Sequence, residues 1–287
     1  MSEIATEIKP TQSASLFNGA VTAHAFGLAT GNWRIGDHTK PENFMRVTAL
    51  AKQFEVSTVW CPKASDFNAK ITQPSDFGPH SPCDFDYQFE IDGIKVMRGA
   101  LASGCAVGKG EAFFMATADC PIMVVRNGVG KIVCAHAGRD ELIDRRLIMY
   151  GYSSGGRRFE SVVDAIANYF GAEIQYLEVA SVFGARHGFV HSVKNLTYGD
   201  FNLSLRQYIM NRWGTRIQCF NIDEELLIQE LIRLQWRSRH SVASDRIWED
   251  KVCTKTDIDD KNNFLWHSVA RGNNQGERNG IFVVVNK

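Results

Sequence analysis

Short blocks of alternating and helically spaced hydrophobic positions follow one another along the whole chain. Phe44, Val47 and Leu50 recur every three positions, which predicts a helix over residues 42–54. Helices are also expected over 161–170, 203–213 and 224–238, and strands over 16–26, 56–60, 84–96, 111–116, 176–183 and 280–285. Because strands and helices intermix from end to end, the order predicts one α/β domain (mixed α+β) over 16–287. Its mixed β-sheets would be flanked by helices, after a flexible leader over 1–15.

The clearest local prediction is a β-hairpin near the middle of the chain. Two apolar runs, 121–125 and 131–135, flank the turn sequence 126–130, which contains Asn-Gly and a second glycine. Asn-Gly supplies the positive φ angles that a tight hairpin needs. With a loop of 127–129, paired residues sum to 256, so Cys120 would lie directly opposite His136. Opposed Cβ atoms in an antiparallel pair lie about 5 Å apart, and a slip of one residue would turn one side chain to the other face.

Composition narrows the classes of function. The 287 residues include 32 basic and 32 acidic side chains, so the net charge of zero gives no signal for nucleic acid or an anionic membrane. No apolar run approaches the roughly 18 residues of a membrane span, and the polar N-terminus lacks the apolar core of a signal peptide. Seven cysteines without a CxxC spacing argue against a disulfide framework. These features favour a cytoplasmic protein.

Cys120 and His136 are the main candidates for chemistry. A thiol and an imidazole at this distance can share a metal ion or form a nucleophile–base pair, and they can also be a plain buried cysteine beside a satisfied histidine. Asp119 precedes Cys120 at the start of a strand, where an acid has no packing reason to be. His136 is followed by Ala-Gly-Arg-Asp, a small-residue turn whose N–H groups can bind an anion.

A metal site would need at least one more ligand. His80, in a proline-rich stretch over 62–86 that we expect to be a long loop, is one candidate. Other candidate ligands are His187, His191, His267, Cys61 and Cys83. Two polar loops are candidates for substrate binding, one over 184–194 with Arg186 and His187, and one before the last strand with Ser268, Arg271 and Arg278.

Two motifs carry a resemblance to a known family. TADC at 117–120 followed by HAG at 136–138 resembles the core of the laccase-domain family, whose members were long described as polyphenol oxidases. Further blocks resemble family elements in the same order: Gly36-Asp37, Asn43 to Arg46, Phe183-Gly184 through Val193, Phe201 to Leu203, Cys253-Thr254, Ser268, Arg271, and Gly276 to Arg278. The resemblance covers the chain from about residue 16 to its end.

The resemblance implies a fold shared with cytotoxic-necrotizing-factor deamidase domains and a metal-dependent purine nucleoside phosphorylase activity with adenosine deamination. It implies zinc, with copper as the alternative metal, held by Cys120, His136 and an upstream histidine. Trp60 or Cys61 occupies the place of that histidine here, so His80 would replace it if its loop folds back.

The resemblance also bears on the substrate-binding residues. The substrates it implies are a purine nucleoside and phosphate, bound by Arg139, Arg186, His187, Ser268 and Arg271. The chain departs from the family at Arg139-Asp140, where the family has Trp-Arg, and at 24–27, where an Arg-x-Gly-Gly element is His-Ala-Phe-Gly.

Three hypotheses follow. The first is the metal-assisted enzyme acting on purine nucleosides, with Cys120, His136, Asp119 and Arg139 at its centre. The second is a metal-free hydrolase or deamidase in which Cys120 is the nucleophile and His136 the base. The third is a non-catalytic protein that keeps the fold. Metal content, nucleoside turnover and selective reactivity of the Cys120 thiol separate the three.

Overall fold

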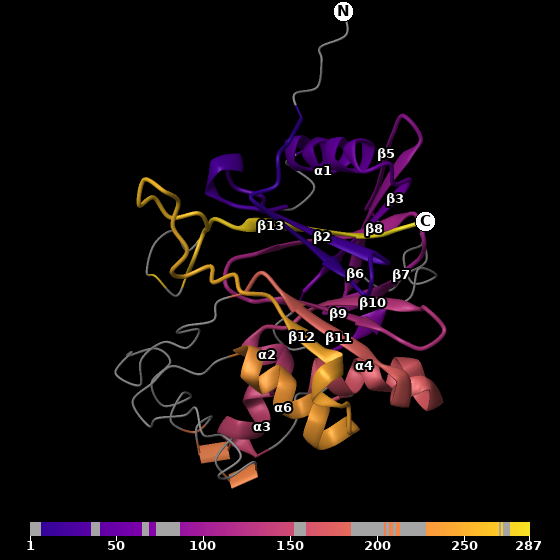
Figure 1. Ribbon diagram of the computed structural model, residues 1–287, viewed down its shortest axis with the longest axis vertical. Coiled ribbons are helices and arrows are strands. Elements are labelled where there is room, and N and C mark those ends of the chain that lie inside the picture. The colour runs from indigo at the N-terminus through magenta and orange to yellow at the C-terminus, as the bar shows by residue number, and fades with distance from the viewer. Residues whose placement is uncertain are drawn as a thin grey trace, which may run out of the picture.

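The computed structural model describes residues 7–35, 41–64, 69–72, 87–151, 159–184, 204, 207–208, 211–212, 228–269, 271 and 276–287 (Figure 1). Within these residues the strands form two sheets. The first has the order β1 (Gln12–Leu16), β2 (Val21–Phe26), β13 (Asn279–Val285), β8 (Glu111–Thr117), β3 (Thr58–Lys63), β6 (Ile94–Leu101) and β5 (Tyr87–Ile91). The second has the order β12 (Ile247–Glu249), β11 (Glu178–Val182), β9 (Ile122–Arg126), β10 (Ile132–His136), β7 (Gly104–Val107) and β4 (Ile71–Thr72).

Both sheets are mixed. In the first sheet β3 runs parallel to β6 and β8, whereas the other pairs are antiparallel. In the second sheet β12 is parallel to β11 and β4 is parallel to β7. The helices are α1 (Pro41–Gln53), α2 (Arg139–Leu142), α3 (Arg145–Tyr150), α4 (Val162–Phe170) and α6 (Ile228–His240), with 3-10 turns η1 (Leu28–Thr30), η3 (Gly171–Tyr176) and η5 (Ser244–Arg246). The mixed α+β architecture predicted from the sequence is confirmed.

The elements stack as four layers (Figure 1). Helix α1 covers the outer face of the first sheet, the two sheets pack face to face, and α4 and α6 cover the outer face of the second sheet. Each interface has its own apolar cluster, which includes Leu50 of α1, Val283 between the sheets and Trp236 of α6. No helix in the described residues is both long and apolar enough to cross a membrane.

Local sequence explains the boundaries of α4, which agree with the prediction. Ser161 is the N-cap, and its Oγ accepts a hydrogen bond from the Val163 N–H at 3.2 Å. The helix ends at Phe170 and is capped by Gly171, whose φ of 56° lies in the region that favours glycine. The predicted strands over 111–116, 176–183 and 280–285 and the helix over 42–54 are confirmed with small shifts in their bounds.

Three predictions about local structure are wrong. The strand expected over 16–26 is interrupted by a turn over 17–20, because β1 ends at Leu16 and β2 begins at Val21. The single strand expected over 84–96 is a hairpin of β5 and β6, turned at Asp92 (φ 51°) and Gly93 (φ 77°), a pair that the Asp-Gly sequence favours. Residues 12–15, expected in a flexible leader, belong to edge strand β1, which pairs with β2 although most of its side chains are exposed.

The remaining differences have simple causes. The strand expected over 56–60 begins at Thr58 and continues to Lys63. Elements α2, α3, β7 and β12 are three to six residues long and carry too few positions to show a period. Most of the loop expected over 62–86, most of the helix expected over 203–213 and the start of the helix expected over 224–238 lie outside the described residues.

Candidate functional site

The segment 117–122 connects the two sheets, because β8 belongs to the first sheet and β9 to the second. Hydrogen bonds outside the β-ladders fix this connection. Thr117 Oγ1 donates to the Cys120 carbonyl at 2.9 Å, and Asn279 Nδ2 donates to the Ala118 carbonyl at 3.0 Å. Cys120 is therefore held at the point where the chain passes between the sheets.

Asp119 is buried in this connection, with a relative exposure of 3%. Its Oδ1 accepts a hydrogen bond from Thr254 Oγ1 at 2.9 Å, which ties the loop after β12 to the connection. Arg271 and Arg278 both interact electrostatically with Asp119. This environment gives the acid a structural reason to precede Cys120, and the catalytic role expected for it stays a prediction.

The predicted hairpin is present, but its predicted register is wrong by two residues. Paired residues sum to 258, so His136 lies opposite Ile122 and not opposite Cys120. Asn127 causes the difference: its N–H donates to the Lys131 carbonyl at 3.1 Å, so the loop is 128–130, and Gly130 is its residue at positive φ. A shift of two keeps every side chain on its own face, and Cys120 remains a diagonal neighbour of His136. The two side chains share a hydrogen bond.

Glu141, in α2, completes the arrangement. The Nδ1–H of His136 donates to Glu141 Oε1 at 2.9 Å, which leaves Nε2 for Cys120. The Glu141 side chain is only 3% exposed, that of His136 is 15% exposed, and Cys120 is partly exposed. We call Cys120, His136 and Glu141 the triad. A thiol, an imidazole and a carboxylate in this order form a nucleophile, a base and a group that orients the base.

Gly138 allows the triad to close. A Cβ atom on Gly138 would lie 2.5 Å from Glu141 Oε2, 2.9 Å from His136 Cε1 and 3.2 Å from Cys120 Sγ. The three groups therefore converge on a position that only a residue without a side chain can occupy. The lack of space for a Cβ atom is the physical reason for a glycine at this position of the HAG motif.

Burial and the charges within the triad shift the pKa values of Cys120 and His136. Burial raises the pKa of the Cys120 thiol, and the imidazole of His136 only partly offsets that rise. Burial acts to lower the pKa of His136, but the Glu141 carboxylate and the Cys120 sulfur outweigh it and raise that pKa well above the usual range. Burial therefore favours the protonated form of the Cys120 thiol, and the Glu141 carboxylate favours the protonated form of His136.

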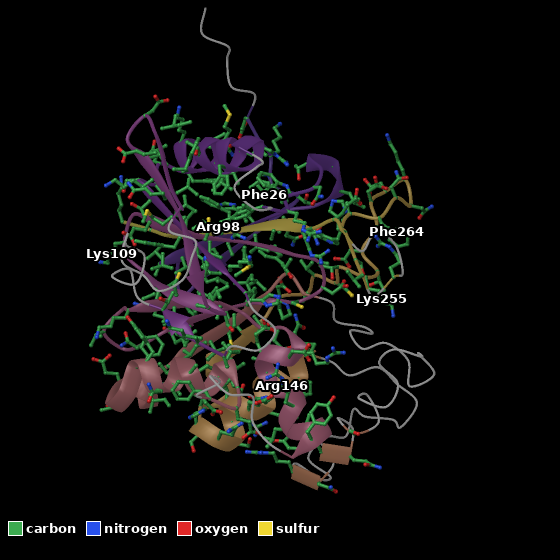
Figure 2. The ribbon with its side chains drawn as sticks, turned by 180° about the vertical axis from the view of Figure 1, so that it is seen from behind. Phe26, Arg98, Lys109, Arg146, Lys255 and Phe264 are labelled. Carbon is green, nitrogen blue, oxygen red and sulfur yellow. The ribbon has the colours of Figure 1, made fainter. Side chains whose placement is uncertain are left out.

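The structure gives the other candidates for substrate binding partners of their own. Among them, Arg139 and Arg271 lie in the described residues. Arg139 forms an ion pair with Asp140 at 3.1 Å. Arg271 lies over the Phe264 ring at 3.7 Å and donates to the Trp266 carbonyl at 2.6 Å, so its guanidinium braces the loop that carries Lys255 and Phe264 (Figure 2).

The remaining predicted site residues are buried or outside the described ranges. Ser268 is buried, and its Oγ accepts a hydrogen bond from the Arg271 N–H at 3.3 Å. His267 is buried, with Nδ1 3.2 Å from Glu277 Oε2. Arg186, His187, His191, His80 and Cys83 lie outside the described residues.

The residues in place of the expected third metal ligand do not face Cys120. Trp60 pairs with Phe113 early in β8, and its indole N–H donates to Glu111 Oε2 at 2.7 Å, whereas Cys120 follows the opposite end of β8. Cys61 packs in the cluster beneath α1, where burial raises its pKa to about 12. In the part of the chain that the structure describes, no group of three ligating side chains gathers. The described part of the chain thus offers two donors for a metal at this place, Cys120 and His136.

Glu141 is the residue that the sequence does not reveal. It follows His136 by five positions, but its contact depends on the turn at 137–138 and on a helix of four residues. An acid five positions after a strand-end histidine is the only signal in the local sequence, and many surface acids share it.

Comparison with known proteins shows that the chain shares its fold with solved structures. No protein-family model matches the sequence, and the search of curated proteins also finds no match. Among solved structures, the chain is similar to the hypothetical protein YfiH of Bacillus licheniformis, with 13% identity and a TM-score of 0.57 over 93% of each chain.

Two further structures give the same result. YlmD of Geobacillus stearothermophilus is 17% identical, with a TM-score of 0.57 over 93% of this chain and 92% of YlmD. NMB0706 of Neisseria meningitidis, which carries the family designation DUF152, is 12% identical, with a TM-score of 0.57 over 93% of this chain and 95% of NMB0706. The fold implied by the resemblance of the TADC and HAG motifs is thus confirmed: over nearly its whole length, the chain has the fold of YfiH, YlmD and NMB0706.

Proposed function

We propose that the protein is a cysteine hydrolase that cleaves an amide bond without a metal. The observation that carries the proposal is the 2.9 Å contact between His136 Nδ1 and Glu141 Oε1, with Cys120 hydrogen-bonded to the same ring. A buried carboxylate in this place fixes the tautomer and orientation of the imidazole and stabilises the imidazolium that forms during thiol activation.

The reaction follows from these positions. His136 takes the proton of the Cys120 thiol, and the sulfur attacks the carbonyl carbon of the substrate, so an S–C bond forms. The C–N bond then breaks, and the imidazolium returns the proton to the departing nitrogen, which leaves as an amine or as ammonia. Water, deprotonated by His136, attacks the thioester, releases the carboxylic acid and restores the thiol.

Selective alkylation tests the nucleophile. We expect iodoacetamide to modify Cys120 in the folded protein, with a rate that rises with pH, while the fully buried Cys61, Cys105 and Cys134 stay unmodified. Peptide mass spectrometry locates the label. His136→Gln should slow the reaction by at least ten-fold because the base is lost. Equal rates in the two proteins would contradict the proposal.

Turnover tests the reaction. Ammonia release from peptides with glutamine or asparagine and from small carboxamides should require Cys120 and persist after treatment with a chelator. The Cys120→Ser variant is the matched inactive control. Turnover that is lost with the chelator and restored by zinc would overturn the metal-free mechanism.

A second candidate is the metal-assisted purine nucleoside phosphorylase that the motifs imply. Glu141 favours it as well, because a carboxylate on the second nitrogen is the usual partner of a metal-bound histidine. Bound zinc or copper would use Cys120, His136 and a third donor and would polarise the substrate. Stoichiometric metal in the purified protein, with phosphate-dependent loss of inosine or adenosine, would establish this activity. A protein with neither bound metal nor a reactive thiol would favour the third hypothesis, a non-catalytic protein that keeps the fold.

A further inference from the structure

Helix α2, which carries Glu141, is too short to hold its own position. It has four residues, and a single helical turn is not stable alone in water, because its hydrogen bonds do not repay the loss of backbone entropy. Helix α2 contacts both α4 and α6 (Figure 1). The place of Glu141 relative to His136 therefore depends on how these two longer helices hold α2.

A buried glutamine of α6 binds the end of α2. Gln235 Nε2 donates to the Leu142 carbonyl at 2.8 Å, and the Gln235 residue is fully buried. Leu142 is the last residue of α2, so its carbonyl has no donor within the helix. The glutamine amide therefore supplies a hydrogen bond that the helix itself cannot make, at the residue directly after Glu141.

The amide of Gln235 is itself held from a third element. Ser161, the N-cap of α4, is fully buried, and its hydroxyl donates to Gln235 Oε1. The Leu142 carbonyl can only accept, so the amide nitrogen of Gln235 faces Leu142 and the amide oxygen faces Ser161. A chain of hydrogen bonds thus runs from α4 through α6 to α2.

The triad leaves α2 little room to move. Glu141 Oε1 accepts the Nδ1–H of His136 at 2.9 Å, and a displacement of about 1 Å would take this contact beyond hydrogen-bond distance. Glu141 Oε2 lies 2.5 Å from the Cβ position of Gly138, so the carboxylate packs closely against the turn before α2. A bond that fixes the end of α2 therefore also fixes the position of the carboxylate.

We propose that Gln235 is a positioning residue of the triad, because its amide keeps α2 where Glu141 reaches the imidazole of His136. Loss of the amide would leave the three triad side chains in the protein but release the helix that carries one of them. The proposal rests on the proposed thiol chemistry for its effect on Cys120, whereas the contact between Glu141 and His136 can be measured without any reaction.

Gln235→Met tests the proposal, because methionine has a similar shape but no donor for the Leu142 carbonyl. The Nδ1–H proton of His136 is bound by a buried carboxylate, so in the wild type it should exchange slowly with water. NMR of the isotope-labelled imidazole measures this exchange, and the signal is assigned by its absence in His136→Gln. We expect Gln235→Met to speed the exchange by about ten-fold. The iodoacetamide rate at Cys120 should fall by several-fold, because the base is less well oriented.

Three comparisons separate positioning from general destabilisation. Gln229→Met makes the same change at a buried glutamine of α6 whose Nε2 has no hydrogen-bond partner among the described residues, and both readouts should keep wild-type values. Ser161→Gly keeps a good N-cap for α4 but frees the Gln235 amide oxygen, so both readouts should change in the same direction by a smaller factor. If Gln235 acts through Glu141, Gln235→Met should slow alkylation in the wild type but not in Glu141→Gln.

The two proposals fail in different ways. Wild-type exchange of the His136 Nδ1–H in Gln235→Met, or the same loss of alkylation rate in Gln229→Met, would overturn the positioning role and leave the thiol chemistry intact. A further loss of rate when Gln235→Met is added to Glu141→Gln would do the same. An Nδ1–H that already exchanges too fast to be seen in the wild type would also overturn the positioning role, because there would be no fixed contact to maintain.

A different result would overturn the thiol chemistry alone. This result is an iodoacetamide rate at Cys120 that is no faster in the wild type than in His136→Gln. The exchange of the His136 Nδ1–H in Gln235→Met would then still decide whether Gln235 positions Glu141.

Discussion

Acid should destabilise the protein through His24, which lies in β2 and is buried with a relative exposure of 9%. Its ring stacks on Phe54 at a centroid distance of 4.1 Å, and Nδ1 lies 2.8 Å from Ser13 Oγ. Burial lowers the pKa of His24 from 6.5 to about 4. The chain therefore folds with a neutral imidazole, although an unfolded chain takes up a proton near pH 6.5.

The sign and size of the effect follow from linkage. Because the folded pKa is below the unfolded one, the unfolded state binds more protons between pH 6.5 and 4, and stability falls as the pH falls through that window. The slope reaches about 1.4 kcal/mol per pH unit. Relative to pH 7.5, the free energy of unfolding should be lower by about 2 kcal/mol at pH 5 and by about 3 kcal/mol at pH 4 from this group alone.

Urea unfolding at pH 7.5 and pH 5 measures this term when the wild type is compared with His24→Leu. The variant keeps an apolar partner for Phe54 and has no imidazole to protonate. Its free energy of unfolding minus that of the wild type should therefore rise by about 2 kcal/mol from pH 7.5 to pH 5. Ser13→Ala, which removes only the hydroxyl beside the ring, should keep the wild-type slope. Parallel stability curves for wild type and His24→Leu would refute the assignment.

Three further predictions concern the site. Gly138→Ala should slow alkylation of the triad thiol by at least ten-fold and cost about 1–3 kcal/mol in urea unfolding, because the new methyl group displaces the triad; wild-type values would contradict the packing. Glu141→Gln should lower the pKa of His136, so the rise of the alkylation rate with pH should move to lower pH and its plateau should fall; an unchanged profile would remove Glu141 from the mechanism. Thr254→Val should cost about 1–3 kcal/mol in the same unfolding assay, because the buried Asp119 carboxylate loses a donor, and Thr254→Ser should restore most of it.

The sequence predicts the face of the hairpin better than its register. Side chains alternate with a period of two, so residues an even number of positions apart share a face, whereas the runs 121–125 and 131–135 are buried on both faces and do not fix the register. The register depends on how Asn127 closes the loop with Lys131, and this is decided by individual hydrogen bonds. An error of two residues therefore left Cys120 and His136 on one face, whereas an error of one would have separated them.

The elements that the sequence missed depend on contacts made after folding. Helix α2 is a single turn of four residues, and its role is to place Glu141 against His136. The pairing of β13 with both β2 and β8 joins strands more than 160 residues apart, and no local pattern specifies such a contact. Arg278 is similar, because only this pairing brings it beside the TADC segment. Sequence patterns thus placed the candidate site on the hairpin, and the strand order decided which charged residues lie near it.

The passage of the chain between the two sheets explains why so many polar side chains surround Cys120. Residues 118–121 leave the first sheet before they join the second, so their backbone groups have no complete ladder and need other partners. Thr117 and Asn279 supply two of these hydrogen bonds, and Thr254 binds the Asp119 carboxylate. These polar residues therefore have a structural role, because they supply hydrogen bonds that the sheets do not provide to this connection. The triad differs from these residues. The side chain of His136 hydrogen-bonds to those of Glu141 and Cys120, and neither bond holds the connection in place. The triad is therefore the place where we expect chemistry.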